Sequence, residues 1–593
     1  MFQRFKYLAA AAMLAAAAEA QATVDYTVDL TSPEHHLAQV SAAFPATPAP
    51  YLEVKMPAWR TGRYTILDLA NGVRRFTATD GQGHPLSWRK IDKSTWRIEL
   101  PQPGAVRVGY ELYANELGLR TRHIDDSHAY LDASAVFMYA DRYRADDVSV
   151  ALSVPPAWKS YSGMTSPAPQ RFVAPNWDIL VDSPIETGIE KAYRFSEGGR
   201  DYEVTIWGDG NYDPGQVVAD IRKIVPQAGS IWSGYPFQRY VFMIHATDGV
   251  GGATEHRNST VIQVPRWNFQ PRAKYLDFLS TTAHEFIHTW NVKNYRAAGM
   301  VPYDYERENY TDLLWLEEGS TEYFADPLLL RAGLMKPDEY FGNLSRLIDR
   351  HKHKFGANEQ SVADASFDEW ISVGGDRANN AQVDIYDEGQ IASWMLDLAL
   401  LQQTGGRISY RDVHEALYRR FGGPARGFTA ADVRAILKEL TGASWEAWWA
   451  QNVDSPARVD FDRLLAPVGL KLQAGPQVAW AGWSAEAAPG GMRLRSVERG
   501  GPAWGAGFVP DDVIVAIDGK RIAGDRFDAA IAESRAGATV TVSYFRRDQL
   551  AQKTMTLGSN PKERPSVVRV EHPTAAQMAL FKRWLLIPYP KGS

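Results

Sequence analysis

The residues best suited to chemistry form the run His284-Glu285-Phe286-Ile287-His288. On a helix, positions i and i+4 lie on one face about one turn apart, so both imidazoles can reach one metal ion. Glu285 lies one position further round the helix, where its carboxylate can hold a water molecule beside that ion. The chain contains no cysteine, so any metal must be bound by histidine or carboxylate side chains. Zinc suits such a set and leaves one coordination position open.

Two histidines could also be packed side chains without a metal, so a third ligand is the next requirement. Residues 310–325 are expected to form a second helix, on which Glu318 falls on the face that Leu314 and Trp315 bury. Glu317 points about 100° away on that helix and is expected to face solvent. A buried carboxylate without a partner is costly, and coordination removes that cost. Two histidines and one glutamate form the ligand set of a catalytic zinc site rather than a closed structural one.

Hydrophobic periodicity predicts the helices that must position these ligands. Residues 280–282 carry hydroxyl groups of the kind that cap helix N-termini, so the helix of the first motif is expected to begin near Ala283. Helical periodicity extends over about residues 270–452. It is clearest after Thr429, a good N-cap residue, and Gly442 then ends that helix.

The chain before the helical region has the pattern of β structure. Between residues 23 and 195, short alternating runs are separated by Gly, Pro and Asp turns, which is typical of a sandwich. The clearest strand candidates there are residues 51–56, 64–69, 74–79, 96–100, 106–112 and 148–154. Two more candidates, residues 202–207 and 240–245, are expected to form a small sheet that supports the helices.

Composition and charge limit the classes of function. The chain has 593 residues, of which 45% are hydrophobic and 23% charged, enough for three or four folded domains. Its formal net charge is −6 and its cations are not clustered, so no nucleic-acid partner is expected. No Gly-x-Ser-x-Gly motif is present, which argues against a serine hydrolase.

The first 22 residues have the pattern of an export signal. Arg4 and Lys6 precede a short Ala/Leu/Met run, and Ala20-Gln21-Ala22 supplies a small-x-small cleavage site. The run is shorter than the ~20 apolar residues that cross a bilayer. No later stretch is long and apolar enough either. We therefore expect an exported protein, periplasmic or secreted, with no transmembrane segment.

Together these motifs resemble a family of peptidases. His284-Glu285-x-x-His288 followed by Trp-x-x-Glu318-Gly is similar to the gluzincin zinc metallopeptidases. The run Trp290 to Lys293, directly after the second histidine, resembles the PDZ-containing glycyl aminopeptidase family. The domain order expected for that family, a β-rich front, a zinc peptidase centre and a PDZ-like back, agrees with the pattern of this chain.

We therefore predict a multidomain α+β protein. After the signal peptide, residues 1–22, come an N-terminal antiparallel β-sandwich over 23–195 and a gluzincin (thermolysin-like) α+β catalytic domain over 196–465. A PDZ-like domain follows over 466–558 and a C-terminal tail over 559–593. Within the tail, residues 574–586 are amphipathic and are expected to dock onto the body of the protein.

The resemblance also implies roles for two further motifs. Gly252-Ala253-Thr254-Glu255-His256 is similar to the Gly-x-Met-Glu-Asn loop of exopeptidases, in which the glutamate binds the free amine of the substrate. Here Thr254 and His256 replace the Met and Asn. A solvated Glu255 at an ordinary Gly-rich strand end is the alternative interpretation.

The second motif lies near the end of the expected catalytic domain. Tyr386-Asp387-Glu388-Gly389 resembles the Tyr-x-Lys-Gly motif of related aminopeptidases, with Glu388 in the position of the lysine. In that motif the tyrosine hydroxyl donates to the oxyanion of the tetrahedral intermediate. The alternative is that Tyr386 is one more packed tyrosine among 27.

The expected function is that of an exported zinc aminopeptidase with one Zn²⁺ per chain, held by His284, His288 and Glu318. Glu285 would act as general base toward water activated by the metal. Peptides with a free N-terminus are the expected substrates, and the resemblance implies a preference for Gly or Ala. Two alternatives stay open: a PDZ-guided endopeptidase, and an inactive zinc-binding scaffold.

The PDZ-like module is also a candidate site for a peptide or protein ligand. Such folds bind extended peptides by adding a strand at an open edge. The segment Trp480 to Trp483 is the candidate for its carboxylate-binding loop. A structural or oligomerising role for the module is the alternative.

Overall fold

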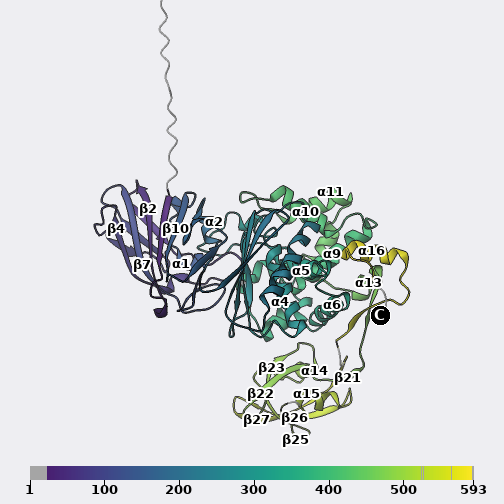
Figure 1. The fold of residues 1–593 in the computed structure, drawn as a ribbon. Helices are drawn as coiled ribbons and strands as arrows, with labels where there is room; N and C mark the ends of the chain where they lie inside the picture. The colour runs from purple at the N-terminus through teal and green to yellow at the C-terminus, as the bar shows by residue number, and fades with distance from the viewer. Residues whose placement is uncertain (1–22, 523, 525, 562–563, 591–593) are drawn as a thin grey trace, which may run out of the picture.

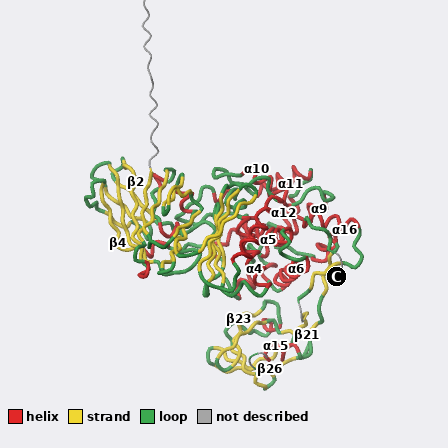
Figure 2. The backbone as a smooth tube through the Cα atoms, in the orientation of Figure 1, coloured by secondary structure: helices red, strands yellow, loops and turns green. Residues whose placement is uncertain are grey.

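The computed structural model describes residues 23–590 apart from 523, 525 and 562–563. The chain forms a β-rich N-terminal domain, a central sheet covered by helices, and a small β-rich domain joined to the helical part by extended segments (Figures 1 and 2). The predicted signal peptide lies outside the described residues. Within the described part of the chain, no helix combines the length and apolarity needed to cross a membrane.

The N-terminal domain is built from three sheets around one hydrophobic core. The largest has the order β12-β13-β10-β1-β2-β7-β4, and its central strands alternate buried and exposed residues, as predicted for a sandwich. The bounds are β1 Thr23–Asp29, β2 Leu37–Thr47, β4 Val73–Asp80, β7 Gly104–Tyr113, β10 Asp147–Ser153, β12 Thr165–Ala168 and β13 Arg171–Ala174. The smaller sheets contain β3 Tyr51–Lys55, β5 Trp88–Lys90 and β6 Thr95–Glu99, and β8 Arg122–Ile124, β9 His128–Leu131, β11 Lys159–Ser162 and β14 Ile185–Gly188.

One predicted strand of this domain is wrong. Residues 64–69 form no strand and follow a turn at Gly62, whose φ is +79°. Tyr64 at its start is buried against Trp370 of the helical region, with ring centroids 6.0 Å apart. The alternation of apolar residues in this segment therefore reflects packing between domains rather than a β ladder.

The central sheet places parallel strands in its middle and antiparallel strands at its edges. Its order is β15-β16-β17-β19-β18, with β16, β17 and β19 parallel. The bounds are β15 Lys191–Glu197, β16 Arg200–Trp207, β17 Arg239–Ala246, β18 Gly252–Glu255 and β19 Ser259–Val264. Helix α4, Arg272–Ile287, packs on this sheet and contacts β18 and β19. The edge strand β18 thus ends beside the helix that carries the first motif.

The helical region follows with its own local signals. Its helices are α5 Ser320–Arg331, α6 Pro337–Lys352, α7 Val362–Asp368, α8 Asp376–Ala381, α9 Asp387–Gln403, α10 Tyr410–Phe421, α11 Ala430–Thr441, α12 Glu446–Asn452 and α13 Phe461–Leu465, with the earlier helix α3 at Pro214–Ile224. Thr429 caps α11 in a capping box and Gly442 ends it in a left-handed conformation, which confirms that prediction.

The predicted start of the motif helix near Ala283 is wrong. Helix α4 begins at Arg272, and the hydroxyls of Thr281 and Thr282 bond backbone carbonyls four residues earlier within the helix.

The small C-terminal domain is inserted into the body through two short ladders. Strand β20, Leu470–Gln473, pairs with β29, Ser566–Arg569, and β21, Gln477–Trp480, pairs with β28, Gly558–Pro561. The domain itself contains β22 Trp483–Ala488, β23 Gly491–Val497, β24 Val513–Ile517, β25 Lys520–Arg521, β26 Thr539–Arg546, β27 Gln549–Thr556, α14 Pro502–Gly505 and α15 Arg526–Ala532. The chain then returns, and α16, Ala575–Leu585, buries Phe581 and Trp584 in the core of the helical region. The predicted docking of the tail is confirmed.

Candidate metal centre and active-site pocket

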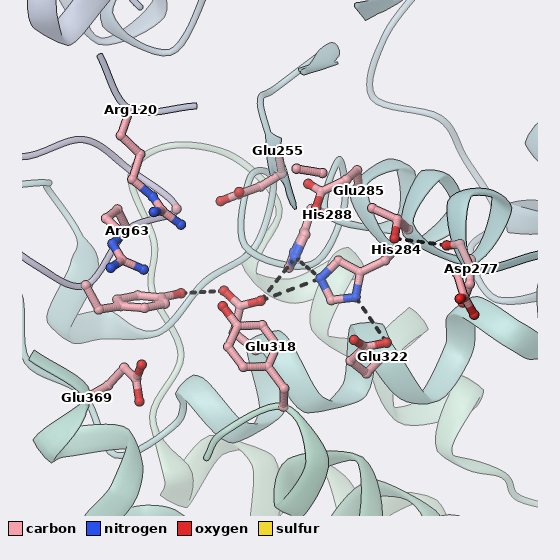
Figure 3. Close-up of a pocket in the computed structure, with 16 residues that line it drawn as sticks. Arg63, Arg120, Glu255, Asp277, His284, Glu285, His288, Glu318, Glu322 and Glu369 are labelled. Carbon is pink, nitrogen blue, oxygen red and sulfur yellow. Dashed lines mark hydrogen bonds and ion pairs between the residues drawn. The ribbon is translucent and has the colours of Figure 1, made fainter. Parts of the chain in front are cut away.

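His284 and His288 are presented on one face of α4, as their spacing predicts. Their Nε2 atoms lie 3.0 Å apart, and they are 3.7 and 3.3 Å from Oε2 of Glu318. All three side chains are at least nine-tenths buried. Two ligands bound to one zinc at ~2.0–2.2 Å lie roughly 3–3.5 Å from each other. The three atoms therefore fit a single zinc ion, and Figure 3 shows them converging on one point.

A close approach of two helices places Glu318. Residues Trp315–Gly319 form a π-helical turn that runs into α5 and packs against the start of α9. A Cβ on Gly319 would lie 2.2 Å from the carbonyl carbon of Gly389, and a Cβ on Gly389 would lie 2.7 Å from the carbonyl oxygen of Trp315. Glycine is required at both positions for this contact, which brings Glu318 and Tyr386 to one pocket.

Hydrogen-bond partners on the side away from the metal position orient the three candidate ligands. Nδ1 of His288 is 3.0 Å from the carbonyl oxygen of Asn291, so Nδ1–H donates there and Nε2 is left with a free lone pair. Tyr64 from the N-terminal domain donates its hydroxyl to Oε1 of Glu318 at 2.7 Å, which leaves Oε2 directed at the histidines. Nδ1 of His284 is 3.6 Å from the carboxylate of Glu322. Carbonyl and carboxylate partners of this kind raise the basicity of metal-binding imidazoles.

Glu285 is buried in the same pocket without a full set of partners. Its side chain is 6% exposed, and Oε2 has no hydrogen-bond partner among the described residues. Burial raises the pKa of Glu285 to about 7, against the opposing effect of His284 and His288. A carboxyl group of this kind can take up and release a proton near neutral pH.

Glu255 ends the edge strand β18 and points into the pocket (Figure 3). It is 4% exposed, which excludes the solvated alternative, and Oε1 has no hydrogen bond among the described residues. Burial raises its pKa, but Lys293, 3.6 Å away, and His288 bring the pKa below its ordinary value, so the carboxylate is charged. A Cβ on Gly62 would lie 2.2 Å from this carboxylate, so the turn at Gly62 fits against it.

The other predicted substrate residues occupy different positions. Ala253 lines the pocket, whereas Gly252, at the start of β18, lies outside its lining. Tyr386 lines the pocket at the N-terminus of α9, with its ring 6.4 Å from that of His284. The enclosing pocket and the nearby carboxylates of Glu318 and Glu369 raise the pKa of Tyr386, so its hydroxyl stays protonated and can donate.

The run from Trp290 to Lys293 joins the elements that surround the pocket. Asn291 donates from Nδ2 to the carbonyls of Leu316 and Glu317, at 3.1 and 2.9 Å. The ammonium of Lys293 is buried and lies 2.8 Å from Oδ1 of Asp182 in the N-terminal domain. This four-residue motif therefore ties the metal helix to the second ligand segment and to the neighbouring domain.

The predicted exposure of Glu317 is wrong. Its side chain is fully buried, and Oε1 accepts a hydrogen bond from the backbone N–H of Ala297 at 2.7 Å. The wider π-helical turn changes the angle between successive side chains, so the 3.6-residue period used for the prediction does not hold there.

Sequence reasoning missed two cations that enter the pocket from the N-terminal domain. Arg63 and Arg120 line a cavity of about 420 Å³ together with the metal ligands, and Figure 3 shows both guanidinium groups directed into it. Neither forms a hydrogen bond or ion pair with the described residues. Burial, with the repulsion of Arg63 and Arg60, lowers the pKa of Arg120 to about 10. These residues lie in loops without periodicity, so the sequence carried no signal for them.

Family models match three parts of the chain. The M61 peptidase N-terminal domain matches residues 25–189, the M61 glycyl aminopeptidase matches residues 277–392, and a PDZ domain matches residues 476–557. Two of these three parts are therefore similar to M61 peptidases. The protein is therefore a metallopeptidase with the multidomain α+β fold that its sequence predicted. The alternative of an inactive scaffold is not supported.

The chain is also similar to solved structures. An aminopeptidase N family protein from Idiomarina loihiensis is 26% identical, with a TM-score of 0.88, and the similarity covers 94% of this chain and 100% of that protein. An M1 zinc metallopeptidase from Deinococcus radiodurans, solved with a Tyr-Ser-Ala substrate, is 14% identical with a TM-score of 0.47 over 74% of this chain and 95% of the other. No curated protein sequence matches the chain.

Proposed function

We propose that this protein is an exported, zinc-dependent aminopeptidase that removes a small N-terminal residue, Gly or Ala, from peptides. The observation that carries the proposal is the buried, charged carboxylate of Glu255 in the same cavity as the metal triad and Glu285. A carboxylate at that place is suited to an α-ammonium group and so sets a one-residue register. The preference for Gly or Ala rests on the family, and export rests on the pattern of residues 1–22.

Each of the residues in the pocket would have its own role in the reaction. When bound by His284, His288 and Glu318, zinc supplies a Lewis acid that acidifies water and polarises a carbonyl. Glu285 would accept a proton from the attacking water and pass it to the leaving amine. Tyr386 would donate its hydroxyl to the oxygen that gains negative charge.

Glu255 binds the substrate only if its free lone pairs are available. Oε1 lacks a hydrogen-bond partner among the described residues, and Lys293 at 3.6 Å is too far for a short hydrogen bond. Lys293 is itself bound to Asp182 and Thr61, at 2.8 and 2.9 Å. The lysine therefore keeps Glu255 charged while leaving an acceptor for the substrate amine.

The test compares wild type with Glu285→Gln and Glu255→Gln on the para-nitroanilides of Gly, Ala and Leu, with and without N-acetylation. We expect wild type to cleave the free-amine Gly and Ala substrates and to reject the acetylated ones. Glu285→Gln should lose turnover while still binding one zinc at this site, and Glu255→Gln should raise KM for the free-amine substrates. Replacement of the exposed Glu116 by Gln is the matched control.

Two results would overturn the proposal. Equal cleavage of acetylated and free substrates would favour the endopeptidase alternative and remove the assigned role of Glu255. Full activity of Glu285→Gln would show that another group moves the proton.

The PDZ domain supports a second contact with peptides. Its strand β22 lies at the edge of the sheet in the order β22-β23-β24-β26-β27, a place where an extended peptide adds as a further strand. The segment Trp480 to Trp483 joins β21 to β22, and it lines a cavity of about 170 Å³ together with His353 and Asn380 of the catalytic body. A ligand of this domain would therefore bind close to the body of the enzyme.

A further inference from the structure

A second cluster of metal-binding side chains lies where the N-terminal domain meets the central sheet. His128 of β9 and Glu186 of β14 come from the N-terminal domain, and His245 of β17 comes from the central sheet. All three are at most 1% exposed. Their ligand atoms lie within 4.8 Å of one another, and the cluster shares no residue with the pocket described above.

The cluster holds polar atoms that the protein itself does not satisfy. Nε2 of His245 is 2.9 Å from Oε2 of Glu186, but Nε2 of His128 is 4.0 Å from Oε1 of Glu186. Both ring nitrogens of His128 and Oε1 of Glu186 have no hydrogen-bond partner among the described residues. A buried polar atom without a partner destabilises the folded state. A hydrogen bond between His245 and Glu186 alone therefore does not account for His128.

Charge also favours a cation at this place. Glu190, which is 7% exposed, lies beside His128, and both of its carboxylate oxygens lack partners among the described residues. Neither Glu186 nor Glu190 pairs with a lysine or arginine of the described chain. A pair of buried carboxyl groups without a cation is stable only if protonated or if a positive ion is bound nearby.

We propose that His128, Glu186 and His245 bind a structural divalent metal ion, with zinc the best match to two imidazoles and a carboxylate. The ion would join strands of two domains. Zinc ligands lie roughly 3–3.5 Å apart, so the approach of His128 Nε2 to Glu186 would shorten from its present 4.0 Å by less than about 1 Å.

The surroundings of the cluster supply the outer contacts that such a site needs. Nδ1 of His245 is 3.3 Å from the side-chain amide of Gln263. With that amide turned so that its oxygen faces the ring, Nδ1–H donates to the oxygen, and Nε2 of His245 is free to bind the metal. Nδ1 of His128 is 3.5 Å from Oδ1 of Asp125. The ring of His128 also stacks on Trp207, with centroids 3.6 Å apart, which fixes its orientation.

The first test counts metal ions in the full-length protein after saturation with zinc and removal of the excess. We expect two per chain in wild type, and one in a His284→Ala/His288→Ala variant whose catalytic site is removed. Glu186→Gln keeps a hydrogen-bonding partner for His245 but removes the carboxylate, and it should hold one zinc at the catalytic site. His414→Gln, at a buried histidine bonded to Tyr295 with an Oη–Nδ1 distance of 2.8 Å, is the matched control and should hold two.

The second test separates a metal from a hydrogen-bonded cluster. In the His284→Ala/His288→Ala background, a chelator should lower Tm, and added zinc should restore it, because an ion that binds only the folded state stabilises it. Adding Glu186→Gln to that background should abolish both responses. One zinc per chain in wild type, or no response of Tm to the chelator in that background, would overturn the proposal. These readouts do not use activity, so they stand apart from the proposed aminopeptidase function.

Discussion

Replacement of Gly319 by alanine is expected to reduce turnover while leaving the metal in place. The added Cβ would lie 2.2 Å from the carbonyl carbon, 2.4 Å from Cα and 2.7 Å from the next backbone nitrogen at the start of α9. All three atoms belong to backbone, so no side-chain rotation relieves the contact. The start of α9, which carries Tyr386, must move away from the π-helical turn that carries Glu318.

The size of this movement follows from the same contact. Ordinary van der Waals contacts of a Cβ begin near 3.4 Å, so the two backbones must separate by roughly 1 Å. Overpacking of a core contact costs about 1–3 kcal/mol of stability. A shift of about 1 Å in a catalytic group lowers the rate about 10²-fold. The loss should appear in kcat, because the role proposed for Tyr386 is toward the oxygen that becomes charged in the transition state rather than toward the bound ground state.

The measurements are kcat and KM on a Gly or Ala substrate, zinc content, and Tm. Gly319→Ala should lose turnover and stability with unchanged zinc, whereas Tyr386→Phe should lose turnover alone. Gly342→Ala is the matched control, because Gly342 lies in α6 with open space around its Cβ position, and alanine there should be neutral or stabilising by up to about 1 kcal/mol. If Gly319→Ala kept wild-type kcat and Tm, the glycine contact would not be what positions Tyr386, and the reasoning would fail.

Two further predictions follow from charged groups outside the metal triad. Arg63→Gln and Arg120→Gln should each raise KM roughly 10-fold for short peptides with a free carboxylate and leave KM for the matching amides unchanged. The reason is that a lost hydrogen bond to a charged group is worth about 1.5–3 kcal/mol. Equal effects on the acids and the amides would contradict binding of the substrate carboxylate by these arginines. At the PDZ junction, the hydrogen bond to Glu498 raises the pKa of His353. The contribution of this pair to stability is therefore present below the pKa of an unfolded histidine, about 6.5, and is lost as pH rises through the raised value. Proteolysis of this junction should therefore accelerate from pH 6 to 8 in wild type, and Glu498→Gln should remove that difference.

The metal triad could be predicted because its geometry is local. The spacing of His284 and His288 fixes their common face on any regular helix, and Glu318 follows a short apolar run whose buried side is evident. The prediction for Glu317 failed where the backbone leaves the regular helix, because a π-helical turn rotates side chains differently. Likewise, the hydroxyl residues at 280–282 resemble caps although they lie inside α4, where Thr281 and Thr282 bond to the preceding turn and Ser280 donates to Asp326.

The residues that sequence reasoning missed act across domain boundaries. Tyr64, Arg63 and Arg120 come from loops of the N-terminal domain more than 150 residues before the metal helix. No periodicity marks a loop residue that is positioned by contacts with another domain. The glycines at 319 and 389 were visible as parts of motifs, but only the packed helices show that they permit the contact between two catalytic segments.

The N-terminal domain consequently forms part of the wall of the candidate active site. Its Tyr64 holds Glu318 in the orientation that the two histidines require, and its Asp182 supplies the carboxylate that balances the buried ammonium of Lys293. Breaking a buried ion pair by removing one partner costs several kcal/mol, because the remaining charge is left uncompensated. A catalytic domain separated from residues 23–195 would thus contain a lysine with only Glu255 as a carboxylate neighbour, and Glu318 would lack its phenol partner. In the proposed function, both the binding of a substrate amine and the affinity for zinc would therefore depend on the interface between the domains.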